Sequence, residues 1–189
     1  MSGEFTDEEL LARFRNSFTK NQAFEAILDK YQKRTYWHIR RIVIDHDDAD
    51  DLVQNTFIKV WENLDNFKEN SKLYTWIYRI ATNESLQFLQ KKRTVSLHDV
   101  DQEMLEKIES GAYFNGNDAE IKLQHAILTL PEKQRIVFNL RYYDNMKYED
   151  MAEFTDTSVG ALKASYHHAV KKIEEFISRP LNLTDSNPS

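Results

Sequence analysis

The stretch DADDLVQNTFIKVWENLDNF, residues 48–67, decides the fold. Its acidic start suits the first turn of a helix, where carboxylates face the positive end of the helix dipole. One face carries the polar residues Asp51, Gln54, Asn55 and Lys59, and a face of this kind is either solvated or a surface for a partner. The apolar residues recur at helical spacing and are Leu52, Val53, Phe57, Val60, Trp61 and Leu64.

Helical spacing continues on both sides of this segment and predicts an all-α protein. Only 4 Gly and 3 Pro occur in 189 residues, so turn signals are few. Thr6 and Glu9 form a capping-box pattern, which predicts a first helix beginning after Thr6. Further helices are expected over about 22–44 and from Ser71 to the basic cluster at 91–93. The expected core includes Leu10, Leu11, Phe14, Phe18, Trp37, Trp61 and Trp76.

Periodicity is lost between residues 94 and 118, and this break divides the chain. The segment contains six Asp/Glu against one Lys, whereas residues 24–93 contain 12 Lys/Arg against 11 Asp/Glu. We interpret it as an acidic linker, with a short helix at Met104–Ile108 left open. The expected organisation is two small helical domains, residues 1–93 and 119–179, joined by the linker at 94–118 and followed by a flexible tail at 180–189.

The second domain carries a helix-turn-helix pattern. Residues 147–154 favour a short helix, 155–157 a three-residue turn, and Ser158 caps a second helix to about Ser178. In DNA-binding proteins the second helix of this motif enters the major groove, although a plain helical hairpin has the same spacing. Candidate DNA contacts are Ser158, Lys163, Ser165 and His167, with Lys171 and Lys172 nearer the backbone.

The bulk composition limits the possible functions. A net charge of −6 argues against a free-standing DNA binder, because affinity for duplex DNA comes largely from neutralising phosphates. The absence of cysteine excludes disulfides and thiolate metal sites. His46-Asp47 invites comparison with metal phosphohydrolases, which need further ligands on neighbouring helices, and no glycine-rich phosphate loop or serine nucleophile motif is found. We expect no catalytic residue, no metal and no cofactor.

The expected location is the cytoplasm, without membrane insertion. The first residues are acidic, where a signal peptide needs a basic start. No run in the sequence approaches the roughly 20 apolar residues of a membrane span.

Two motif sets in this chain resemble those of one family, the extracytoplasmic-function (ECF) sigma factors of the sigma-70 family. Residues 48–67, followed by YTWIYRIATN at 74–83, resemble region 2, and LPEKQR at 130–135 with SVGALK at 158–163 resemble region 4. Tyr166-His167-His168 is most similar to factors of Bacteroidetes-type bacteria. The resemblance implies a region 2 bundle and a region 4 helix-turn-helix.

The resemblance also implies roles for particular residues. The helix around residue 51 would dock on the clamp helices of the largest subunit of core RNA polymerase, and region 4 would contact the polymerase flap. The loop at 67–72 and the next helix would read the melted minus-ten element, and the residues named above on the second helix of region 4 would contact the minus-thirty-five element. Polymerase-binding candidates are Asp50, Asp51, Leu52, Gln54, Asn55, Phe57 and Lys59. Minus-ten candidates are Phe67, Lys68, Lys72, Tyr74, Arg79 and Asn83.

The family resemblance implies further partners and leaves an alternative. Many members are held inactive by an anti-sigma factor, so an anti-sigma factor or another regulatory protein is expected, and the acidic linker would thread through the RNA exit channel or serve as a plain spacer. Ser165, His168 and Val170 replace arginines that are frequent in the family, which weakens the expected minus-thirty-five contact. The alternative is a two-domain helix-turn-helix regulator whose first domain binds a partner other than polymerase.

Overall fold

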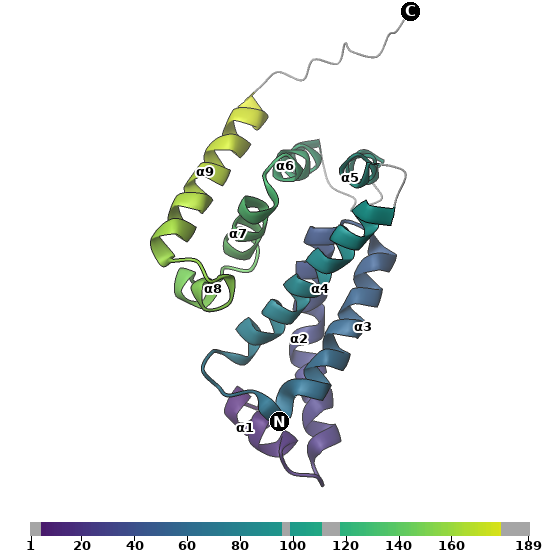
Figure 1. Ribbon diagram of the computed structural model, residues 1–189, viewed down its shortest axis with the longest axis vertical. Coiled ribbons are helices and arrows are strands. Elements are labelled where there is room, and N and C mark those ends of the chain that lie inside the picture. Colours follow the sequence, from purple (N-terminus) through teal and green to yellow (C-terminus); the bar gives the residue numbers. More distant parts are fainter. Residues whose placement is uncertain (1–4, 96–98, 111–117, 179–189) are drawn as a thin grey trace, which may run out of the picture.

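The computed structural model describes residues 5–95, 99–110 and 118–178, and this part of the chain is built of helices (Figure 1). None of the described helices is long and apolar enough to cross a membrane. In chain order the helices are α1 (Asp7–Phe14), α2 (Lys20–Val43), α3 (His46–Asn63), a 3₁₀ turn η1 (Leu64–Asn66), α4 (Leu73–Val95), α5 (Val100–Glu109), α6 (Asp118–Leu128), α7 (Glu132–Tyr142), α8 (Tyr148–Thr155) and α9 (Val159–Ser178).

The first group of helices is a bundle of α2, α3 and α4, with α1 at one end and α5 at the other (Figure 1). The capping box expected at the start of α1 is confirmed: Glu9 N donates to Thr6 Oγ1 at 3.2 Å, and Thr6 N donates to a Glu9 carboxylate oxygen at 2.8 Å. Between α2 and α3 the chain reverses through Ile44, whose φ of 64° is unusual for a β-branched residue. Asp45 then caps α3 by accepting a hydrogen bond from Asp48 N at 2.9 Å.

The bundle core is formed by the apolar stripes of these helices, and it corrects part of the expected core. Leu10, Leu11 and Phe14 are buried, but α1 ends at Phe14, so Phe18 lies beyond the helix and is 94% exposed. Trp37 and Trp61 were expected in the core and are 42% and 36% exposed. The Trp61 ring covers the edge of the core, with its centroid 5.3 Å from that of Phe14. Trp76 is only partly buried.

The segment interpreted as a linker is more structured than expected. Instead of a short helix at Met104–Ile108, residues 100–109 form α5, which spans ten residues. Asp99 caps it through hydrogen bonds from Asp101 N and Gln102 N. Val100, Met104 and Ile108 are at most 3% exposed and belong to the core of the bundle. The amphipathic spacing of these three residues therefore fixes α5 on the first domain. The remaining residues 96–98 and 111–117 lie outside the described part.

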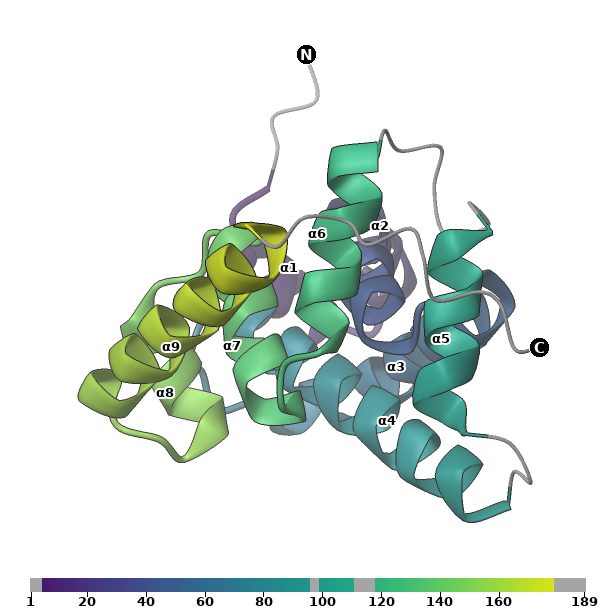
Figure 2. The same cartoon turned by 90° about the horizontal axis from the view of Figure 1, so that it is seen from above.

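The second group, α6 to α9, has its own core of Ala126, Ile127, Leu130, Phe138, Ala169 and Ile173. The helix-turn-helix expected from the sequence is confirmed. Helix α8 ends at Thr155 and is followed by its C-cap residue Asp156, which has a left-handed φ of 49°. The Ser158 hydroxyl then accepts a hydrogen bond from Ala161 N at 3.2 Å as α9 begins. Leu162 of α9 is 1% exposed and belongs to the same apolar cluster as Met151 of α8. Figure 2 shows α7, α8 and α9 on one side of the molecule and α5 on the other, with α6 between them.

Candidate polymerase and DNA interfaces

The polar face of α3 is exposed along the length expected for a docking surface. Asp51, Gln54 and Asn55 all lie on the outside of the bundle. The same face continues with Ile58, which is 56% exposed and was not selected from the sequence. It lies seven residues after Asp51, hence two helical turns along the same face. Three polar groups beside an exposed isoleucine make a small amphipathic surface of the kind that binds protein partners.

The other four candidates for polymerase contact are buried or already paired within the protein. Leu52 and Phe57 are each 5% exposed, because they form the inner side of α3. Their role in docking would be to hold the helix in place. Lys59 is exposed but forms an ion pair of 2.5 Å with Glu84 on α4. Asp50 is partly exposed and lies 3.5 Å from the His46 ring within α3.

The minus-ten candidates are not a single exposed patch. Lys68, Arg79 and Asn83 are exposed. Phe67 is 7% exposed and packs against Trp76, with ring centroids 5.1 Å apart, so its ring is not free to stack on a base in this conformation. The remaining two, Lys72 and Tyr74, contact the second domain.

A carboxylate of the helix-turn-helix binds both of those residues. Asp150, on α8 and 5% exposed, accepts hydrogen bonds from the Lys72 ammonium at 2.9 and 3.0 Å and from the Tyr74 hydroxyl. Burial alone would raise the pKa of Asp150, but the bonds from Lys72 and Tyr74 outweigh burial and hold that pKa below its usual value. Burial, together with the neighbouring Asp150, raises the pKa of Tyr74 to about 12. Asp150 is therefore an anion and Tyr74 a donor at neutral pH.

A second aspartate of the second domain, Asp144, binds the next turn of α4 and its neighbour α2. Asp144 accepts hydrogen bonds from Arg41 at 2.7 Å and from the Tyr78 hydroxyl at 3.2 Å. Tyr78 is 1% exposed and is stacked on the buried His38, with centroids 4.5 Å apart. Its ring joins a cluster with five apolar residues that follow Leu130 in the chain, together with Leu162 of α9. Two adjacent turns of α4 are thus covered by the second domain.

Asn83, the remaining residue expected to contact a base, faces the helix-turn-helix across a cavity. The cavity has a volume of about 340 Å³. Its walls come from α4 on one side and from α7, the turn and α9 on the other. The lining residues are Thr82, Asn83, Leu86, Lys133, Ile136, Val137, Thr155, Thr157, Leu162 and Ser165.

The six minus-thirty-five candidates divide between opposite sides of α9. Lys163, His167 and Lys171 recur at intervals of four and are exposed. Ser165 lines the cavity, and Lys172 donates to the Gln134 side chain on α7 at 3.1 Å. At about 100° per residue these two lie on the opposite side of the helix from Lys163, so one DNA groove would not contact both sets. Ser158 is exposed and caps the helix.

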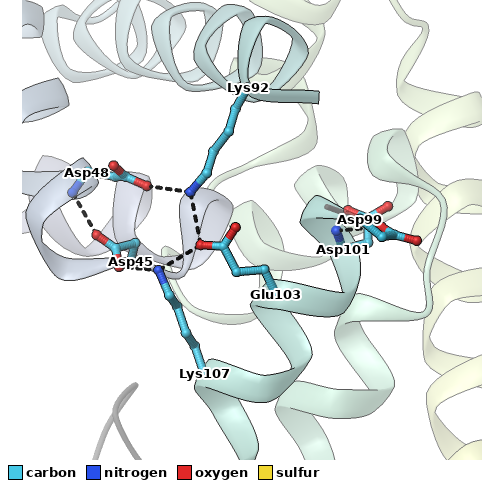
Figure 3. A network of polar contacts seen from close by, with 7 residues as sticks. All are labelled: Asp45, Asp48, Lys92, Asp99, Asp101, Glu103 and Lys107. Carbon is cyan, nitrogen blue, oxygen red and sulfur yellow. Dashed lines mark hydrogen bonds and ion pairs between the residues drawn. The ribbon is translucent and has the colours of Figure 1, made fainter. Parts of the chain in front are cut away.

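A polar network holds α5 against the ends of α3 and α4 (Figure 3). Lys107 of α5 forms ion pairs with Asp45 at 2.5 Å and with Glu103 at 3.1 Å, and Lys92 of α4 pairs with Asp48 at 3.2 Å and with Glu103 at 3.3 Å. Hydrogen bonds from Lys107 and Lys92 hold the pKa of Glu103 below its usual value, against the opposing effect of burial. The acids of the linker thus neutralise a basic end of α4.

Arg93 extends the same pattern to the second domain. It pairs with Asp101 of α5 at 2.9 Å and with Glu132 at the start of α7 at 3.0 Å. The hydrogen bond from Arg93 to Asp101 is the main reason that the pKa of Arg93 is raised. One guanidinium therefore joins α4, α5 and α7.

Both groups of helices match models of known protein families. The family model for sigma-70 region 2 matches residues 27–95, and that for sigma-70 region 4 matches residues 120–173. The chain is 33% identical over 186 residues to the ECF RNA polymerase sigma-E factor of Escherichia coli K12, covering 92% of this chain and 95% of that protein. The sigma-E factor of Haemophilus influenzae is 29% identical over 188 residues, covering 94% of this chain and 98% of that protein.

Solved structures show the same fold. CnrH in complex with the cytosolic domain of CnrY superposes with a TM-score of 0.69 at 20% identity, covering 90% of this chain and 96% of that one. The sigma factor RpoE in complex with the anti-sigma factor NepR from Bartonella quintana gives a TM-score of 0.64 at 21% identity, covering 82% and 96%. The chain belongs to the sigma-70 family, among the ECF RNA polymerase sigma factors. The alternative of a regulator with a non-polymerase partner domain is not supported.

Sequence reasoning missed the residues that join the two domains. Asp144 follows α7 in a short loop, and Asp150 lies in the first turn of α8, where an acid needs no explanation beyond the helix dipole. Tyr78 follows the apolar spacing of α4 and is indistinguishable from an ordinary core residue. Ile58 could have been found, because it continues the spacing of Asp51 and Asn55.

Proposed function

We propose that the chain acts as an alternative sigma subunit, which binds core RNA polymerase, recognises promoter DNA and promotes strand opening in the cytoplasm. The observation that carries this proposal is the order of the two matched regions along one chain, together with an exposed polar face on α3 in the first of them. The polymerase supplies the chemistry of RNA synthesis, so the proposed role requires no catalytic residue in this chain.

Within region 2 we assign polymerase docking to the exposed face of α3. Asp51, Gln54, Asn55 and Ile58 share this face, while Leu52 and Phe57 support it from inside. A partner surface with one exposed apolar residue among polar ones gains its affinity from burying that residue and its specificity from the polar groups. The ion pair between Lys59 and Glu84 joins the docking helix α3 to α4, to which we assign DNA binding.

We assign minus-ten recognition to α4 and to the loop that leads into it. Asn83 would offer both donor and acceptor groups to the edge of an extruded base, and Lys68, Lys72 and Arg79 would contact phosphates. The hydroxyl of Tyr74, which is protonated at neutral pH, would donate to the same DNA backbone. Phe67 would have to leave its place against Trp76 before it could contact a base.

In region 4 we assign duplex contact to the side of α9 that carries Lys163, His167 and Lys171. These three side chains are exposed and follow the N-terminal cap of the recognition helix. Three cations at most on this surface give weak independent affinity, because each phosphate contact contributes a modest amount. Recognition of the promoter would therefore depend on the polymerase that holds both domains.

The assignments are tested by separating binding from strand opening. Asp51→Arg should weaken association with core polymerase, measured by fluorescence anisotropy of the labelled factor. Asp29→Arg, the same change at an exposed position on α2, is the control. Asn83→Ala should leave that association unchanged and reduce promoter melting, measured by permanganate reactivity of unpaired thymines. Gln90→Ala, at an exposed site on the same helix, is its control. Loss of the same step in both variants would contradict the assignment.

A further inference from the structure

The turn between α1 and α2 reaches across to the loop that leads into α4. Arg15, which directly follows α1, donates through one terminal nitrogen to the Phe67 carbonyl oxygen at 3.3 Å and pairs with the Glu69 carboxylate at 2.8 Å. Lys20, the first residue of α2, pairs with Asp65 at 2.6 Å. Two cations that flank one turn therefore hold the segment 65–69 at three of its residues.

The turn is itself braced by hydrogen bonds. The Thr19 hydroxyl donates to the Arg13 carbonyl oxygen at 2.7 Å, and Thr19 N donates to the Asn16 carbonyl oxygen at 3.0 Å. Helix α1 packs against α2, and the Asp7 carboxylate at its start accepts a hydrogen bond from the Tyr31 hydroxyl at 2.6 Å. The turn is therefore a fixed support for the two cations.

The loop has an unusual backbone conformation at Glu69. Its φ of 55° is left-handed, which is uncommon for a residue other than glycine. Such conformations persist where the surrounding structure holds them. Arg15 binds the Glu69 side chain and the carbonyl of the residue two positions earlier. Lys68 lies between these two residues and is exposed, so its backbone is held on both sides while its side chain faces solvent.

We propose that Arg15 is a positioning residue for minus-ten recognition, which holds the loop 65–72 in the conformation that reads the promoter. The inference rests on the proposed function for the role of the loop, whereas the contacts that hold the loop do not depend on it. Arg15 acts through other residues, because its nitrogen binds a carbonyl and a carboxylate of the protein. The residues it positions are Phe67 and Lys68, two of the minus-ten candidates.

The contact at Phe67 holds the main chain and leaves the ring able to move. The Phe67 ring lies against Trp76, with centroids 5.1 Å apart, and would have to turn away to reach a base. Its carbonyl is held by Arg15, and its N–H donates to the Leu64 carbonyl oxygen at 3.1 Å. The side chain can therefore change its rotamer while the backbone stays in place, which fixes the position from which the ring meets the DNA.

The brace is tested on the full chain without polymerase, by nuclear magnetic resonance. Arg15→Gln should lower the amide order parameters of residues 68–70 from about 0.85, typical of rigid backbone, toward about 0.6. Arg13→Gln is the matched control, because it removes the same charge from a guanidinium that lies over the Phe5 ring instead of the loop. Unchanged order parameters in Arg15→Gln, or an equal fall in Arg13→Gln, would overturn the brace.

A charge exchange separates the ion pair from a general loss of folding. Arg15→Glu places two carboxylates together and should loosen the loop, and adding Glu69→Arg should recover the rigidity at position 69. Failure of the double variant to recover it, with the helical circular dichroism retained, would overturn the ion pair as part of the brace.

The reading role is tested by transcription with core polymerase on templates that carry each of the four bases at each minus-ten position. A wrong base in a protein–DNA site typically costs a factor of about 5 to 150. Arg15 and Glu69 are each nearly half exposed, and an ion pair at this exposure shifts an equilibrium by at most about fivefold. Arg15→Gln should therefore lower the preference for the best base over the next by about fivefold, and Arg13→Gln should leave it unchanged.

The two tests have separable outcomes. A uniform loss of transcription on all templates, with the base preference kept, would show a merely structural role for Arg15 and overturn the positioning. Weaker association of Arg15→Gln with core polymerase than of Arg13→Gln would do the same. If the parent chain directs no transcription, the proposed function fails, and the order parameters still decide whether Arg15 holds the loop.

Discussion

Helix α5 should detach from region 2 when Met104 is shortened to alanine. Met104 is 3% exposed, and with Val100 and Ile108 it forms the apolar side that fixes α5 to the bundle. Deleting a buried methionine side chain costs about 2–5 kcal/mol. A ten-residue helix is too short to be stable by itself, so this loss should act on the docking of α5 as a unit.

The expected magnitude follows from the docking equilibrium. A loss of about 3 kcal/mol multiplies the detached population by roughly 100, at 1.36 kcal/mol for each factor of ten. Native-state hydrogen exchange should show the amides of α5 exchanging faster by about that factor, while the centres of α3 and α4 keep their protection. The ion pairs of Lys107 are partly exposed and would not compensate.

The matched control is Met104→Leu, which keeps the volume and should cost less than about 1.5 kcal/mol. The reasoning would be refuted by unchanged protection of α5 in Met104→Ala. It would also be refuted by an equal loss of protection across α3, α4 and α5, because α5 would then be an inseparable part of the bundle. Detachment as a unit would fit a linker that must leave region 2 to reach another site on polymerase.

Three further outcomes are expected. Thr6→Ala should lower the free energy of unfolding by about 1 kcal/mol through loss of the N-cap of α1. Urea titration measures this change, and an unchanged midpoint of unfolding would contradict a stabilising role for the cap. The pKa of Asp150 is lowered by Lys72 and Tyr74 against the effect of burial. Its contribution to the free energy of unfolding should therefore be present above the ordinary aspartate pKa of about 4 and be lost as the pH falls through the lowered pKa. A loss of stability between pH 8 and pH 6 that is absent in Asp150→Asn would contradict this. Lys163→Ala should reduce the salt dependence of duplex binding by about one phosphate contact, whereas an unchanged slope would place that side of α9 away from DNA.

The sequence was sufficient for the helices because their signals are local. The capping box at Thr6, the apolar spacing of residues 52–64 and the turn before Ser158 each depend on residues within one or two turns, and the structure has all three. Errors came where a helix ended earlier than its apolar pattern suggested. Phe18 continues the spacing of Phe14, but α1 stops before it, and nothing in the spacing marks that end.

The relation between the domains could not be predicted, because it depends on contacts between residues far apart in the chain. The Lys72–Asp150 pair spans 78 residues and the Arg41–Asp144 pair spans 103. Asp144 and Asp150 are both acids of a kind expected in a loop or a first helical turn, so the sequence gives no sign of their partners in the other domain. The same holds for α5, whose acids look like an unattached linker until Lys92 and Arg93 are found beside them.

Run-off transcription with core RNA polymerase, with and without this chain, tests the central claim most directly. Templates would be drawn from the genome that encodes the protein, and the Asp51→Arg variant serves as the matched negative control. The account predicts discrete transcripts from particular start sites only when the intact chain is added. Equal transcription with and without it, or no measurable association with core polymerase, would contradict the account.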